Sequence, residues 1–156
     1  MISFFYDLFH NYLFISAALG WLVAQIIKTA LDLFLTKEFS IERLVGSGGM
    51  PSSHSATVCA LCTATLLKCG AGSGEFAISA ILAIIVMYDA RGVRRETGNQ
   101  AVVLNKMMDY FTNEHPEKDL FDEDNLKELI GHTPLQVSIG AILGIVIALI
   151  LSRFAI

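Results

Sequence analysis

The segment from Gly48 to Ser55 combines the residue types that bind anions at the start of a helix. Its sequence is G-G-M-P-S-S-H-S, so glycines and a proline lead into serines and a histidine. Glycine lets the backbone approach a ligand closely, and serine caps a helix start, where N–H groups and the helix dipole attract anions. We therefore expect Ser52 and Ser53 to hold a phosphate-like anion, with His54 beside it as a proton donor. The alternative is a capped helix start without a ligand.

A second cluster, D-A-R-G-V-R-R at residues 89–95, ends an apolar stretch with three arginines. Arginine forks match phosphate oxygens bidentately, so Arg94 and Arg95 are candidates for the same anion. The alternative is that these residues anchor a helix end at the cytoplasmic side of a membrane.

A third cluster, G-H-T-P-L-Q at residues 131–136, opens the last apolar stretch. His132 and Gln136 are four residues apart and share a helix face. The alternative is a capping turn with an interfacial histidine. Lys28 lies inside the first apolar stretch, where an ionisable residue is a functional candidate, although a lysine near a helix end also reaches the interface.

Four apolar segments must position these residues, at about 12–35, 55–70, 76–88 and 135–151. The chain is 54% hydrophobic and 17% charged, against roughly 25% charged in soluble domains. A membrane-crossing helix needs about 20 apolar residues, and the short second and third segments pass only with their polar ends at membrane depth. We predict an all-α fold, an integral membrane bundle of about four transmembrane helices in a single domain, residues 1–156. A soluble four-helix bundle is the alternative, but residues 139–151 lack a polar face.

The basic residues predict the orientation of this bundle. With four spans, the two termini and the second loop share one side, which holds Lys68 and Arg153; the other nine of the eleven lysines and arginines lie at the first and third loops. The positive-inside rule then places those two loops in the cytoplasm and both termini outside, in a multi-pass protein of the cell membrane. The three clusters and Lys28 gather at the cytoplasmic face. Residues 106–131 are expected to form a polar loop with a short helix.

Small residues predict close helix packing. Ala56, Ala60 and Ala64 lie four apart, and Gly140 and Gly144 form a G-x-x-x-G, so these helix faces also offer a route to an oligomer. The three cysteines lack the second pair that a zinc site needs, and the net charge of −4 gives no nucleic-acid footprint. We expect membrane lipids as partners and no nucleic acid.

The chain resembles the type 2 phosphatidic acid phosphatase superfamily, which includes lipid phosphate phosphatases and vanadium-dependent haloperoxidases. Lys28 resembles the lysine of its first motif, although no R-P follows. The segment P-S-S-H at 51–54 resembles the second motif, P-S-G-H. His132 with Gln136 resembles the third motif, with glutamine for aspartate and without the arginine that precedes the histidine. From Gly20 onward the chain resembles the divergent bacterial and plant branch of the superfamily.

The resemblance implies a metal-independent and cofactor-independent phosphomonoesterase, similar to a phosphatidic acid phosphatase, acting on a lipid phosphate or diphosphate. His132 would form a phosphohistidine, His54 would protonate the leaving oxygen, and Gln136 would orient His132. The phosphate oxygens would be held by Lys28, Ser52, Ser53, Arg94 and Arg95. Two alternatives stay open: an inactive relative that binds phospholipid head groups, and a structural membrane protein that assembles with a partner.

Overall fold

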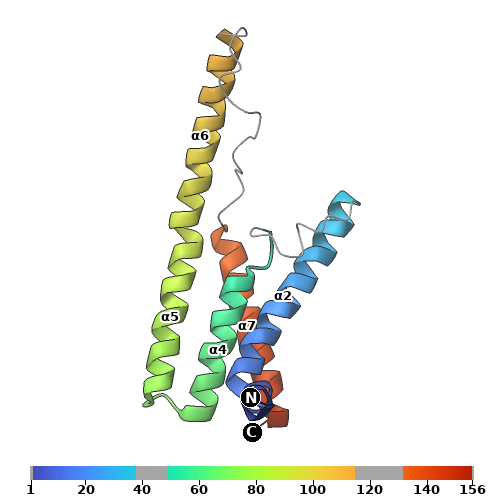
Figure 1. Ribbon diagram of the computed structural model, residues 1–156, viewed down its shortest axis with the longest axis vertical. Helices are drawn as coiled ribbons and strands as arrows, with labels where there is room; N and C mark the ends of the chain where they lie inside the picture. Colours follow the sequence, from blue (N-terminus) through green and yellow to red (C-terminus); the bar gives the residue numbers. More distant parts are fainter. Residues whose placement is uncertain (1, 38–48, 115–131, 156) are drawn as a thin grey trace.

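The computed structural model describes residues 2–37, 49–114 and 132–155, and every regular element in these ranges is a helix. The helices are α1 (Ile2–Phe9), α2 (Tyr12–Thr36), α4 (Ser53–Cys69), α5 (Gly74–Arg91), α6 (Val93–Glu114) and α7 (Pro134–Ala155). Figure 1 shows α2, α4, α5 and α7 side by side, with α6 continuing the line of α5 beyond the others. The predicted all-α fold is confirmed.

Helix α4 lies at the centre of the bundle and packs against α2, α5 and α7. Within the described ranges, three helical stretches are long and apolar enough to cross a membrane: Tyr12–Thr36, Gly74–Phe111 and Pro134–Phe154. With 17 residues, α4 is at the short end of the length that spans a bilayer, about 17 to 25 residues. A crossing by α4, and with it the count of four spans, stays a prediction.

The interior of the bundle consists mainly of small residues, and many large apolar side chains point outward. Ala24, Ala56, Ala60, Ala64 and Ala148 are completely buried. The exposed set includes Trp21, Ile26, Ile78, Ile81, Ile84, Ile85, Ile142 and Ile150. A soluble bundle would bury these large side chains, because their transfer from water is its main source of stability. The distribution is that of a bundle surrounded by lipid, so the chain forms an all-α membrane bundle.

Glycines bring the helices into backbone contact around α4. A Cβ on Gly20 of α2 would come within 2.9 Å of the Ala56 carbonyl oxygen. On α7, a Cβ on Gly140 or Gly144 would collide with the carbonyl oxygens of Ser52 and Ala56, respectively. The small-residue faces seen in the sequence are therefore used to pack α2, α4 and α7 within one chain, as expected for membrane helices.

Buried hydroxyl groups add links between helices that the sequence did not indicate. The Tyr12 hydroxyl on α2 donates to the Ala148 carbonyl on α7 at 3.0 Å, and the hydroxyls of Thr65 on α4 and Ser79 on α5 lie 2.6 Å apart. Hydrogen bonds of this kind satisfy polar groups that would otherwise face hydrocarbon.

The third predicted segment, 76–88, lies within a much longer helical stretch. Helix α5 ends at Arg91, and α6 follows at once, with the Glu96 N–H donating to the Gly92 carbonyl at 3.0 Å. Residues 106–114 of the expected polar loop are thus helical, because their apolar residues recur at helical spacing among the charges. Residues 115–131 lie outside the described residues, and the single domain stays a prediction.

Candidate functional site

The start of α4 is built as an N-terminal cap inside the protein. Ser52 is completely buried, and its Oγ accepts hydrogen bonds from the N–H and the hydroxyl of Ser55 at 3.4 and 3.1 Å. The first-turn N–H groups of Ser53 and His54 come before any helical carbonyl that could accept them. The local geometry therefore assigns Ser52 to capping and leaves the N–H groups of the next two residues to form the positive helix end.

Gly49 shapes the loop that leads into this helix. It has φ +79°, a left-handed conformation that residues with a Cβ rarely adopt, and a Cβ there would come within 3.1 Å of Cγ and Cδ of Lys28. The aliphatic stem of Lys28 thus lies directly over Gly49, and the lysine is 3% exposed. This contact joins α2 to the start of α4 and brings a cation to the expected anion site.

The start of α7 is a capping box formed by Thr133 and Gln136. The Gln136 N–H donates to the Thr133 hydroxyl at 3.3 Å, and the Thr133 N–H donates to Gln136 Oε1 at 2.9 Å. Thr133 is followed by Pro134 at the first helical position, so T-P-L-Q is a helix-start signature that the sequence already carried. The side-chain oxygen and the backbone N–H of Gln136 are consequently both held by Thr133.

The same amide fixes the protonation pattern of His132. Gln136 Oε1 also lies 3.2 Å from Nδ1 of His132, which is 2% exposed. Because a backbone N–H can only donate, the atom that it contacts on Gln136 must be the oxygen. His132 Nδ1 is then the donor, and in the neutral ring the lone pair is on Nε2. That is the tautomer a nucleophilic or proton-accepting Nε2 requires.

His54 lies next to His132, on the neighbouring helix. The two ring centroids are 6.3 Å apart and the ring planes are inclined by 59°. Two backbone hydrogen bonds hold the surrounding segments together: the Ser52 N–H donates to the Gln136 carbonyl, and the His132 N–H donates to the Ala90 carbonyl, both at 3.1 Å. The starts of α4 and α7 and the end of α5 therefore meet at one place.

Six of the eight predicted site residues are brought together by these contacts. They are Lys28, Ser52, Ser53, His54, His132 and Gln136. Arg94 and Arg95 begin α6 close in sequence to Ala90, but their side chains lie outside the described residues. The functional role of all eight stays a prediction.

Helix α2 adds polar groups that the sequence reasoning did not include in the site. Gln25 is 5% exposed, and the hydroxyl oxygen of Thr29 is buried with no hydrogen-bond partner among the described residues. Both lie within one turn of Lys28. The sequence does indicate them, because Gln25 and Thr29 interrupt the same apolar segment as Lys28.

The described ranges contain no group of three or more His, Cys, Asp and Glu side chains arranged to hold a metal ion. The arrangement offers instead two imidazoles, a buried ammonium and a helix N-terminus, a combination suited to an oxyanion. It can position a nucleophilic nitrogen and a proton donor around one small anionic group.

Comparison with known proteins identifies a family and a relative. A family model described as the divergent PAP2 family matches residues 9–147. The uncharacterized membrane protein YuiD of Bacillus subtilis (strain 168) is 39% identical over 155 residues, which cover 95% of this chain and 98% of the relative. No solved structure matches the chain.

Proposed function

Since this chain belongs to the divergent PAP2 family, we propose that it hydrolyses a lipid phosphate or diphosphate through a phosphohistidine on His132. The observation that carries the proposal is the pair of hydrogen bonds at Gln136 Oε1, which orients His132 and, in the neutral ring, places the lone pair on Nε2. A nucleophile must be oriented and deprotonated at the attacking atom; this contact orients the ring and, in its neutral form, puts the hydrogen on Nδ1 and not on Nε2.

The reaction consists of two transfers at phosphorus. His132 Nε2 attacks the phosphorus, the P–O bond to the lipid breaks, and His54 donates a proton to the leaving oxygen. Water then attacks the phosphorus, its proton passes to His54, and the P–N bond breaks to return the electron pair to His132. Inorganic phosphate leaves, and both histidines regain their starting state.

The phosphate oxygens bind at the positive end of α4. The N–H groups of Ser53 and His54 point toward the anion, and Lys28 supplies a full positive charge from α2. Arg94 and Arg95 add bidentate contacts from the start of α6. The proposed site lies at the cytoplasmic face of the cell membrane, with both termini outside.

A second candidate function rests on Gln136 itself. An amide cannot stabilise an imidazolium as a carboxylate does; in serine proteases, where the amide also imposes the wrong histidine tautomer, this replacement costs about 10⁴ in rate. A chain with this glutamine would serve as a receptor for phospholipid head groups if its residual rate is too low for turnover. A purely structural membrane protein would neither hydrolyse phosphate nor bind head groups at this site.

Phosphate release from the purified full-length protein distinguishes these functions. The assay uses a panel of lipid phosphates and diphosphates in lipid nanodiscs, with vanadate as a mimic of the phosphoryl transition state. The matched control for His132→Ala is His10→Ala, because His10 is exposed and lies between the end of α1 and the start of α2, far along α2 from Lys28.

We expect wild type and His10→Ala to release phosphate and bind vanadate, and His132→Ala to release none. Release that survives His132→Ala would rule out the phosphohistidine. Vanadate binding without phosphate release from any of the lipids indicates the head-group receptor. The absence of both vanadate binding and phosphate release indicates the structural role.

A further inference from the structure

A groove lies between the C-terminal ends of α4 and α7, at the opposite end of these helices from the candidate site. Its volume is ≈ 500 Å³, within the range of about 300–1,000 Å³ that small-molecule pockets have. The two helices start together at the site and run in the same direction, since Gly144 packs against Ala56 and Ala148 clusters with Ala64. The residues that line this α4–α7 groove are Leu67, Val146, Leu149, Ile150, Ser152 and Arg153.

The walls of the α4–α7 groove are apolar and face the lipid around the bundle. Its four large apolar side chains are between 41% and 56% exposed. Three of them, Val146, Leu149 and Ile150, share one face of α7 because they are spaced three and four residues apart. Tyr12 of α2 packs against Ala148 on another side of α7. Since α7 is long and apolar enough to cross the membrane, the hydrocarbon chains of lipids fill this groove.

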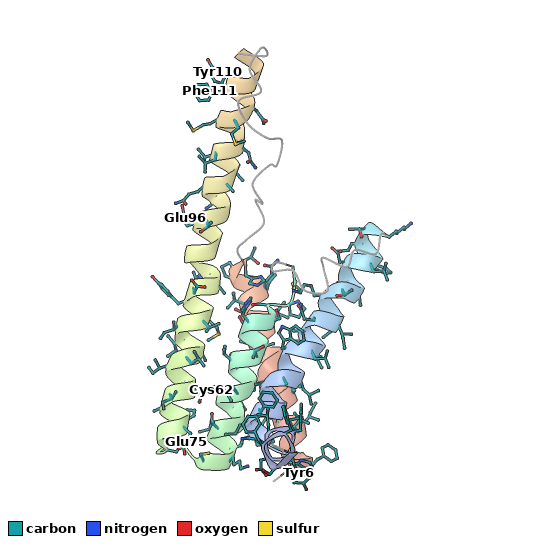
Figure 2. All side chains as sticks on the ribbon, in the orientation of Figure 1. Tyr6, Cys62, Glu75, Glu96, Tyr110 and Phe111 are labelled. Carbon is teal, nitrogen blue, oxygen red and sulfur yellow. The ribbon has the colours of Figure 1, made fainter. Side chains whose placement is uncertain are left out.

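Positive charge lies at the polar end of the α4–α7 groove. Arg153 is part of the lining, is exposed and belongs to the last turn of α7, and Lys68 follows Leu67 in the last turn of α4. The acidic residues described at this end, Asp7 and Glu75, do not line the groove. Figure 2 shows Glu75 at the start of α5, with the end of α4 between it and the end of α7. A basic side chain at the end of a membrane helix reaches the depth of the lipid phosphates, so charge and apolar wall follow the order of a phospholipid.

We propose that the α4–α7 groove binds one phospholipid of net negative charge, with an acyl chain along α7 and the phosphate on Arg153. The charge selects the head group. A zwitterionic head group carries a cation of its own, which would meet Arg153 and Lys68, whereas an anionic head group brings none. The bound lipid stabilises the bundle, because it binds the folded chain and not the unfolded one. The proposal does not depend on the proposed hydrolysis, since the groove and the candidate site lie at opposite ends of α4 and α7.

Native mass spectrometry of the purified full-length protein tests this site, because it counts the lipids retained from mixed micelles of phosphatidylglycerol and phosphatidylcholine. Arg153→Gln removes the charge at the groove, and Lys106→Gln is its matched control, since it removes the same charge from an exposed position on α6. Leu149→Trp fills the groove. Its control is Ile84→Trp, because Ile84 is 60% exposed on α5 and does not line the groove. Retention is compared with that of wild type, so a lipid held at the candidate site, which all four variants keep, does not affect the difference.

We expect wild type to retain phosphatidylglycerol in preference to phosphatidylcholine. Arg153→Gln should weaken phosphatidylglycerol binding about fivefold, the effect of about one basic residue near an anionic lipid surface. Leu149→Trp should lower the retention of both lipids, and the two controls should match wild type. Unchanged retention in Arg153→Gln would mean that Arg153 only interacts with the end of its own helix, and it overturns the proposal. Unchanged retention in Leu149→Trp, equal losses in the controls, or equal retention of the two lipids by wild type overturns it as well.

Thermal unfolding in nanodiscs provides a second measurement, which does not depend on lipid retention in the gas phase. We expect the Tm of wild type to rise with the fraction of phosphatidylglycerol, because a ligand of the folded state stabilises it by mass action. The rise should be smaller for Arg153→Gln than for Lys106→Gln. Equal rises in these two variants contradict the site on Arg153.

Discussion

Replacing Gln136 by glutamate tests the proposed chemistry at a single atom. Glutamate has the length of glutamine, so its carboxylate can keep both contacts of Oε1, at 2.9 Å to the Thr133 N–H and 3.2 Å to His132 Nδ1. Glutamate is also the usual partner in a capping box, and its charge is favourable at a helix N-terminus. The variant therefore changes the charge beside His132 while the geometry is retained.

The expected gain follows from the strength of the hydrogen bond to His132. A neutral hydrogen bond contributes about 0.5–1.5 kcal/mol and one to a charged group about 1.5–3 kcal/mol, a difference of about 1–1.5 kcal/mol. His132 acquires positive charge as it attacks phosphorus, so the difference lowers the barrier by that amount. Each 1.36 kcal/mol is about tenfold in rate. We expect Gln136→Glu to raise kcat for phosphate release about tenfold.

The companion variant Gln136→Asp distinguishes the effect of the added charge from the effect of side-chain length. Aspartate is one methylene shorter and cannot keep both the Thr133 and His132 contacts in their present positions. We therefore expect it to gain less than glutamate, in spite of carrying the same charge. Vanadate affinity is measured in parallel and should fall in both variants, because a negative charge is added beside the bound anion.

The reasoning is refuted if Gln136→Glu is slower than wild type while its thermal stability is unchanged. It is also refuted if aspartate restores more activity than glutamate, since the capping-box geometry would then not govern the site.

Three other perturbations follow from the contacts described. His54→Ala should slow substrates with poor leaving groups by about 10²-fold or more while sparing activated aryl phosphates, because a good leaving group needs little protonation; a matched series of phosphate esters measures this. Gly140→Ala should lower the free energy of unfolding by about 1–3 kcal/mol and weaken vanadate binding, because its Cβ would push against the Ser52 carbonyl; Gly72→Ala, where a Cβ meets nothing within 4 Å, should change neither. Cysteines introduced at Lys106 and Gly72 should be labelled from the cytoplasmic and the outer side, respectively, and the reverse pattern in intact cells would contradict the proposed orientation.

The helices were predictable because each apolar segment is much longer than the uncertainty in where its ends lie. The expected segments 12–35, 55–70, 76–88 and 135–151 correspond to α2, α4, α5 and α7 with ends shifted by a few residues. The prediction of a polar loop from residue 106 is wrong for residues 106–114, which belong to α6. The charges of this segment are interleaved with apolar residues at helical spacing, which is the pattern of an amphipathic helix.

The grouping of the site was predictable in part. Helix ends that share one side of a bundle must be neighbours, which is how Lys28, His54 and His132 were placed together from the sequence. The contact of the Lys28 stem with Gly49 was not accessible, because it depends on a loop conformation with positive φ. The pairs Tyr12–Ala148 and Thr65–Ser79 are equally invisible in the sequence, since each joins helices whose relative rotation is set by packing.

The packing of small residues has a consequence for the chemistry. The Ser52 carbonyl lies against Gly140, and the Ser52 N–H donates to the Gln136 carbonyl, one turn earlier on α7. The distance between the start of α4, the proposed anion site, and His132 is thus fixed by contacts between backbones, with no long side chain between them to adjust. Because backbone contacts set the positions of α4 and α7, these helices can shift little relative to each other. The chemistry of the site can still change through the replacement of one side chain. In the proposed mechanism the decisive side chain is Gln136, which would take the place of a carboxylate without its charge.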